Sequence, residues 1–106
     1  MALRGEVYWV KLPPPVGRRP VLIIQNNKGN QHSLSTIVAT ISTSPPDVEY
    51  PFLVELDSRL LGEPCWVHCE TILTIPQNLL DDRLGSLGHL ETAKVDEALK
   101  RSLNLK

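Results

Sequence analysis

The sequence has no long apolar run, no excess of one charge and almost no cysteine. Its 106 residues carry a formal net charge of −1 and include two cysteines. A membrane span needs about 18 consecutive apolar residues, and no segment approaches that length, so we expect no membrane contact. The N-terminal MALRGEVYWV lacks the basic, apolar and small-residue order of a signal peptide, which favours a cytoplasmic protein. The near-neutral balance argues against a chain that coats nucleic acid with a basic surface.

The sequence also lacks internal repeats, low-complexity tracts and any linker long enough to divide it. A chain of this length buries roughly 65% of its unfolded surface on folding. We therefore expect one domain over residues 1–106.

The two cysteines lie in the segment PCWVHC. If this segment is a strand, the Cα atoms of Cys65 and Cys69 lie about 13 Å apart, whereas a disulfide needs less than about 7 Å. His68 would face the opposite side of the strand, which excludes a Cys–His–Cys metal cluster. We expect two reduced, packed thiols, no metal and no cofactor.

Strand patterns dominate the first three quarters of the chain. Asn and Gly crowd QNNKGNQHS (25–33), which predicts a turn or loop. A short helix is compatible with Gln77–Asp81, and GSLGHL (85–90) is a candidate sixth strand. The strands are expected at EVYWVKL (6–12), PVLIIQ (20–25), TIVATIS (36–42), FLVEL (52–56) and CWVHCETILTI (65–75).

The last segment changes to a helical period. Val95, Ala98, Leu99 and Leu103 follow the spacing of one helix face, which predicts an amphipathic helix over about 91–103. Strands followed by one helix indicate a mainly β, α+β fold: a small curled antiparallel sheet or barrel of five or six strands with the helix laid on it.

The positive charge is concentrated near the N-terminus. Residues 1–28 have a net charge of +4 and residues 29–106 a net charge of −5. Arg18 and Arg19 stand between Gly17 and Pro20, directly before the apolar run of the second strand. They are either a solvated flank or dimer contact, or a phosphate-binding pair, because the guanidinium fork fits phosphate and stays charged.

Two further sets of polar residues leave alternatives open. Thr36, Thr40 and Ser42 share one face of the predicted strand, as in a solvent-facing strand, or as hydroxyls that position a phosphate. No G-x-S-x-G motif marks Ser42 as a covalent nucleophile. His68 and Glu70 are either an acid–base pair able to deprotonate a ribose 2′-hydroxyl, or a half-buried histidine satisfied by its neighbour.

Four strings in this order resemble the MazF/PemK/Kid toxin endoribonucleases. They are RGEVYWV, RPVLIIQN, GN…S…TIVA and HLE…VDEALKRSL, and the likeness covers almost the whole chain, least from Gln77 to Gly88. The resemblance implies an SH3-like barrel, a homodimer, and metal-independent cleavage of single-stranded RNA. In that family the 2′-hydroxyl attacks the adjacent phosphate, leaving a 2′,3′-cyclic phosphate and a 5′-hydroxyl.

The resemblance also implies site residues. The arginine before the proline of RPVL is the catalytic one, here Arg19, and the hydroxyl that closes the IVAAIT-type strand corresponds to Ser42. The expected substrate-binding residues are Gly17, Arg18, Thr43, Glu70 and Thr71.

Two departures from the family pattern stand out. The family has a Ser-Glu-Gln-Gly-Gly-like segment before RP, whereas only Arg18 separates Gly17 from Arg19. In the strand that usually contains EQIRTI, Thr71 and Leu73 replace a glutamine and an arginine.

The resemblance implies two kinds of partner besides RNA. A cognate antitoxin would lay an acidic C-terminal segment over the arginines and compete with RNA for them. The alternative function is a non-catalytic family member that binds RNA, antitoxin or a protein target such as gyrase.

Overall fold

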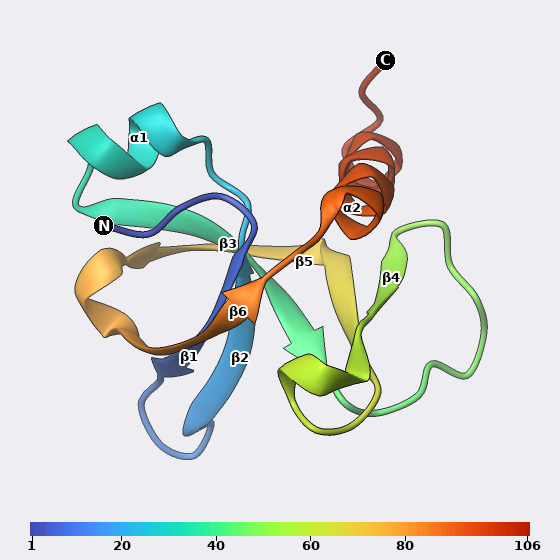
Figure 1. The fold of residues 1–106 in the computed structure, drawn as a ribbon, viewed down its shortest axis with the longest axis horizontal. Helices are drawn as coiled ribbons and strands as arrows, with labels where there is room; N and C mark the ends of the chain where they lie inside the picture. The colour runs from blue at the N-terminus through green and yellow to red at the C-terminus, as the bar shows by residue number, and fades with distance from the viewer.

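A computed structural model describes all 106 residues. Six strands form one sheet in the order β4-β5-β3-β2-β1-β6, and every neighbouring pair is antiparallel. The sheet curls, and the C-terminal helix α2 lies beside it (Figure 1). This confirms the predicted mainly β class. The strands are β1 (Glu6–Lys11), β2 (Arg18–Ile23), β3 (Ser35–Ser42), β4 (Leu53–Leu56), β5 (Cys65–Pro76) and β6 (Leu80–Ser86).

The two faces of the sheet carry separate apolar clusters, because successive side chains of a strand point to opposite faces. One cluster has eleven buried residues and includes Val95 and Ala98 of α2 (His89–Ser102), so we call this the helix-covered face. The other has six buried residues, among them Val21, Val38 and Ile75, and we call this the open face. Adjacent residues of β2 and β3 thus serve different faces.

The segment 25–33, predicted as a turn or loop, contains a short helix, so that prediction was wrong. Helix α1 spans Asn27–His32, and the Asn26 side chain caps it by accepting a hydrogen bond from the Gly29 backbone N–H. Asn30 is buried, and its Oδ1 accepts a 2.6 Å hydrogen bond from Thr36 Oγ1 of β3. The cap, the buried contact with β3 and a 2.8 Å hydrogen bond from the Gln77 side chain to the Asn30 carbonyl therefore stabilise a helix that the local composition does not favour.

The sixth strand lies earlier than GSLGHL. Strand β6 is Leu80–Ser86, and its pairing with β1 places Arg83 opposite Tyr8. Only Gln77–Leu79 of the expected short helix is helical, as the 3₁₀ helix η2. Strand β2 begins at Arg18 rather than Pro20, because Arg18 pairs with Lys11 of β1. Both arginines therefore belong to the strand.

Candidate functional site

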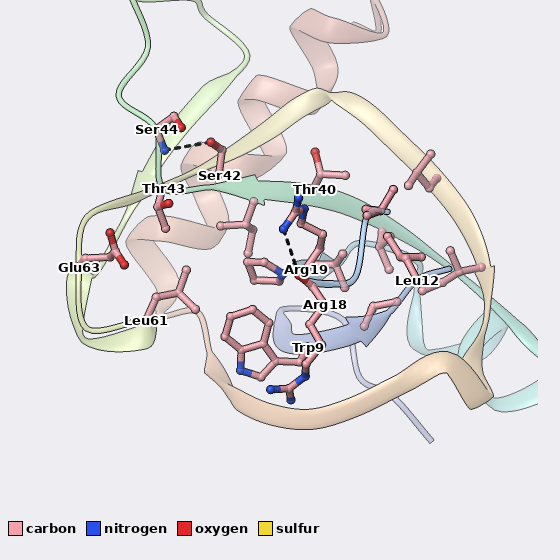
Figure 2. A pocket seen from close by; sticks show the side chains of 18 residues that line it. Trp9, Leu12, Arg18, Arg19, Thr40, Ser42, Thr43, Ser44, Leu61 and Glu63 are labelled. Atoms are coloured by element: carbon pink, nitrogen blue, oxygen red, sulfur yellow. Dashed lines mark hydrogen bonds between the residues drawn. The ribbon is translucent and has the colours of Figure 1, made fainter. Parts of the chain in front are cut away.

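A hollow of about 870 Å³ lies on the open face, where β2 begins and β3 ends (Figure 2). Apolar side chains of both strands, among them Val21 and Val38, form part of its wall. Its polar lining consists of Arg18, Arg19, Thr40, Ser42, Thr43, Ser44 and Glu63.

The strand register explains why Arg19 and Ser42 line the same hollow. In the β2–β3 ladder, Val21 pairs with Thr40 and Leu22 with Ala39. Continuing this antiparallel register by two residues sets Arg19 across from Ser42 on the face that Val21 and Thr40 share. The two strands thus bring two residues that are 23 positions apart in the sequence to the same hollow.

The two adjacent arginines have different surroundings. Arg18 forms ion pairs with Asp81 and Asp82 of β6, each at 3.3 Å, and its guanidinium lies 4.9 Å from the centre of the Trp9 ring. Arg19 has no carboxylate partner in the structure, and its guanidinium donates only to the Arg18 carbonyl, at 3.3 Å. Arg19 is therefore the cation that the hollow leaves free for an anion.

Ser42 Oγ accepts a 3.0 Å hydrogen bond from the Ser44 backbone N–H, which leaves its own hydrogen free to donate into the hollow. Thr40, two residues earlier, also lines the hollow. Thr36 does not: it is fully buried and bonded to Asn30. For Thr36, both interpretations of the hydroxyl row, solvent-facing and phosphate-positioning, were therefore wrong.

Three of the predicted site residues lie outside the lining of the hollow. Gly17, with φ +70°, ends the β1–β2 loop, which is closed by a hydrogen bond from the Leu12 N–H to the Gly17 carbonyl. Glu70 and Thr71 lie in an irregularity of β5, where the register moves from Ile72 to His68 against consecutive residues of β3. Of the seven predicted residues, the structure brings together Arg18, Arg19, Ser42 and Thr43.

His68 also lies outside the hollow. Its Nδ1 is 3.4 Å from the Glu70 carboxylate, whereas its Nε2 is buried without a hydrogen-bond partner. His68 is the cross-strand neighbour of Thr40, two pairs along the ladder from the pair of Ser42 and Trp66. The geometry agrees with a half-buried histidine that its neighbour satisfies on one side only.

The two cysteines are free and buried, as the strand geometry predicted. Burial raises the pKa of Cys69 to about 11, so that thiol stays protonated near neutral pH. No group of three or more His, Cys, Asp or Glu side chains is arranged to hold a metal ion. No helix has both the length and the apolar character needed to cross a membrane.

Glu63 and Trp9 line the hollow, and the sequence did not single them out for this site. Trp9 comes from β1, where it pairs with Pro20. Glu63 comes from the Leu61-Gly62-Glu63-Pro64 turn that leads into β5. The Gly-Glu-Pro string could have indicated Glu63, because it predicts a charged residue on a short turn before a buried strand.

The fold and this site match a known family. Residues 3–103 match the model of the PemK-like, MazF-like toxin of type II toxin–antitoxin systems. The chain belongs to that family. This confirms the resemblance on which the site residues were assigned.

Relatives in this family cover nearly the full length of the chain. It is 39% identical to the endoribonuclease EndoA of Bacillus subtilis, over 96% of this chain and 94% of EndoA. It is 35% identical to the endoribonuclease MazF of Staphylococcus epidermidis, over 99% of this chain and 93% of that protein. These relatives confirm the predicted enzyme class, an endoribonuclease.

Solved structures agree with the fold. A mycobacterial endoribonuclease in complex with its cognate antitoxin superposes with a TM-score of 0.87 at 28% identity, covering 100% of this chain and 98% of that one. The Mycobacterium tuberculosis toxin MazF-mt6 superposes with a TM-score of 0.83 at 25% identity, covering 95% of this chain and 98% of that one.

Proposed function

We propose that this family member is a toxin that cleaves single-stranded RNA at a short sequence motif without a metal ion. The ribose 2′-hydroxyl loses its proton to solvent and attacks the adjacent phosphorus, the bond to the 5′-oxygen of the next nucleotide breaks, and that oxygen takes up a proton from solvent, so that the number of protons is unchanged. The products carry a 2′,3′-cyclic phosphate and a 5′-hydroxyl. The observation that carries the proposal is an arginine without a carboxylate partner that lines the same hollow as a serine hydroxyl.

Arg19 acts on the charge that develops during this reaction. The pentacoordinate transition state carries more negative charge on its phosphoryl oxygens than the diester does, and a fixed guanidinium stabilises that increase. A guanidinium remains protonated at any relevant pH and offers a planar fork of donors. Support comes from the absence of a competing carboxylate, so that Arg19 does not have to break an ion pair to bind phosphate.

Ser42 positions the reacting group. Its hydroxyl, oriented by the Ser44 N–H, donates to a phosphate oxygen or holds the 2′-hydroxyl in line with the leaving oxygen. Arg18 adds positive charge at the edge of the hollow while it stays attached to Asp81 and Asp82.

The proposal extends to two partners. A second copy of the chain would lengthen the groove so that splayed bases on both sides of the scissile phosphate can be recognised. An antitoxin with an acidic C-terminal segment would occupy the hollow through Arg19 and Arg18 and exclude RNA. The likeness to an endoribonuclease solved with its cognate antitoxin supports this second partner.

The test uses the purified protein, a long single-stranded RNA and EDTA. Cleavage should continue in EDTA and should stop when the ribose at the cut site is replaced by 2′-deoxyribose. Arg19→Ala should slow cleavage by about a hundredfold or more, and Arg19→Lys should restore only part of the rate. The matched control is Arg59→Ala, which removes an exposed arginine paired with Asp57 outside the hollow.

Other outcomes would contradict the mechanism. Cleavage that EDTA abolishes, or that Arg19→Ala leaves intact, would exclude it. Binding of RNA without cyclic-phosphate product, or gyrase inhibition without RNA cleavage, would favour the non-catalytic alternative.

A further inference from the structure

Glu63 is an unpartnered carboxylate in the proposed RNA site. It lines the hollow together with Arg19 and Thr43, and it takes part in no hydrogen bond or ion pair in the structure. Figure 2 shows it at the end of the hollow where β3 ends, near Thr43 and Leu61, with Arg19 on the other side. The proposed cleavage chemistry assigns it no role.

The loop that carries Glu63 is held at both ends. On one side, Leu60 and Leu61 pack against the large cluster of the helix-covered face, and on the other Cys65 is fully buried. Gly62 adopts φ +79°, and Pro64 fixes the following φ angle. The backbone of the turn therefore holds Glu63 at a defined place beside the hollow, and its exposed carboxylate is free to meet a ligand.

A carboxylate is an unfavourable neighbour for a phosphate, because both are negative. The hollow thus has a cationic end at Arg19, suited to the scissile phosphate, and an anionic end at Glu63, suited to a group that donates hydrogen bonds. In single-stranded RNA such donors are the N–H groups of the bases, which are exposed on their Watson–Crick edges.

Guanine fits a carboxylate better than the other bases do. Its N1–H and N2–H₂ groups are adjacent donors, which a carboxylate accepts with both oxygens at once. Cytosine and adenine offer one amino group beside an acceptor, and uracil offers one N–H between two carbonyls. A carboxylate would repel those acceptors.

We propose that Glu63 is a specificity-determining residue that recognises a guanine flanking the scissile phosphate. This inference rests on the ribonuclease activity proposed above. The Thr43 hydroxyl, at the same end of the hollow, is free to add a hydrogen bond to that base. Glu63 contributes to the choice of sequence and takes no part in proton transfer.

The experiment maps 5′-hydroxyl ends that the wild type and Glu63→Gln produce from a random-sequence RNA pool in EDTA. The wild type should prefer guanine over the other bases by at least about tenfold at one motif position. The glutamine amide in Glu63→Gln offers one acceptor and one donor, which matches adenine and cytosine as well as guanine, so the preference for guanine at that position should be lost, and cleavage at adenine and cytosine should gain. The preferences at the other motif positions should stay unchanged.

A second substrate pair isolates the contact. Replacing that guanine by inosine removes the N2 amino group and should slow the wild type by about tenfold, whereas Glu63→Gln should discriminate little between the two bases. The matched control is Glu55→Gln, an exposed glutamate of β4 outside the hollow, which should keep the wild-type motif.

The outcomes separate this inference from the activity beneath it. Arg19-dependent cleavage with the same motif in the wild type and Glu63→Gln would overturn only the role of Glu63. Loss of cleavage on every sequence, or an equal gain on every sequence, would likewise overturn base recognition in favour of proton transfer or simple charge repulsion. Cleavage that does not depend on Arg19 would instead overturn the proposed function.

Discussion

The helix-covered face and the open face of the sheet differ in what fills them. Eleven buried residues, all apolar or cysteine, pack between the sheet and α2 on the first face. The open face has six such residues, and beyond them lies the hollow with its free arginine and unpartnered glutamate. One face therefore supplies most of the stability, and the other presents polar groups to solvent.

The two functions are interleaved along the same strands. In β2, Leu22 faces α2, whereas Arg19 and Val21 face the hollow; in β3, Ala39 faces α2, whereas Thr40 faces the hollow. Side chains alternate between the two faces along each strand. Substitutions on the helix-covered face should therefore change stability, and substitutions on the open face should change activity.

The largest expected effect is on the helix-covered face. Leu22→Ala leaves a cavity next to α2 and should lower the free energy of unfolding by about 2–5 kcal/mol, while the folded fraction keeps its RNA cleavage rate. Urea unfolding followed by tryptophan fluorescence measures the change. Leu34→Ala, at a position 91% exposed, is the control and should leave the urea midpoint in place. Equal losses in both variants would contradict the division between faces.

Ser42→Ala, on the open face, should lower activity and leave stability almost unchanged. Removing the hydroxyl should slow RNA cleavage by about tenfold, and the free energy of unfolding should stay within about 0.5 kcal/mol of the wild type, because the site is at the surface. Ser42→Thr keeps a hydroxyl and should retain the rate. A cleavage rate that is the same for Ser42→Ala and the wild type would remove Ser42 from the mechanism.

Low pH should lower the stability of the protein partly through the open face, which contains the buried carboxylate of Glu6. Burial alone would raise the pKa of Glu6, but hydrogen bonds from the Leu3 N–H, Arg83 and Tyr8 lower it below its ordinary 4.5. Its stabilising contribution is therefore complete above pH 4.5 and is lost as the pH falls through the lowered value. Between about pH 6 and pH 3, the free energy of unfolding measured with urea should fall by about 1 kcal/mol less in Glu6→Gln than in the wild type. If Glu6→Gln and the wild type lose the same stability on acidification, Glu6 is not a source of the acid sensitivity.

The smallest effect should come from releasing Arg18. The double substitution Asp81→Asn and Asp82→Asn removes both of its carboxylate partners, so affinity for a non-cleavable 2′-deoxy oligonucleotide should rise about two- to fivefold at low salt. High salt should erase the gain. Asp47→Asn, in the β3–β4 connection, is the control. A gain that persists in high salt would argue against an electrostatic cause.

The sequence was sufficient for β1 to β5 and the last helix, because each has a clear apolar pattern. It was not sufficient for α1, whose short polar sequence is stabilised by Asn30 binding Gln25 and Thr36 inside the fold. Nor could it locate β6, because its pairing with β1 joins residues that are distant in the sequence, such as Glu6 and Ser86.

Site residues that belong to a recognisable sequence motif could be predicted, whereas residues placed by the path of the chain could not. Arg19 and Ser42 came from the family resemblance, but only the structure shows that they line the same hollow. Glu70 lay outside the lining because β5 is irregular there, and Glu63 entered it through a turn whose direction no local pattern gives.

The β1–β2 connection has a consequence for how such proteins diversify. A hydrogen bond between Leu12 and Gly17 closes it at the base, and its tip is exposed, so added residues would not disturb the sheet. Doubling the length of a flexible loop costs only about 0.6 kcal/mol. A lineage can therefore lengthen or shorten this tip beside the arginines almost freely, and so acquire new RNA targets while the scaffold stays the same.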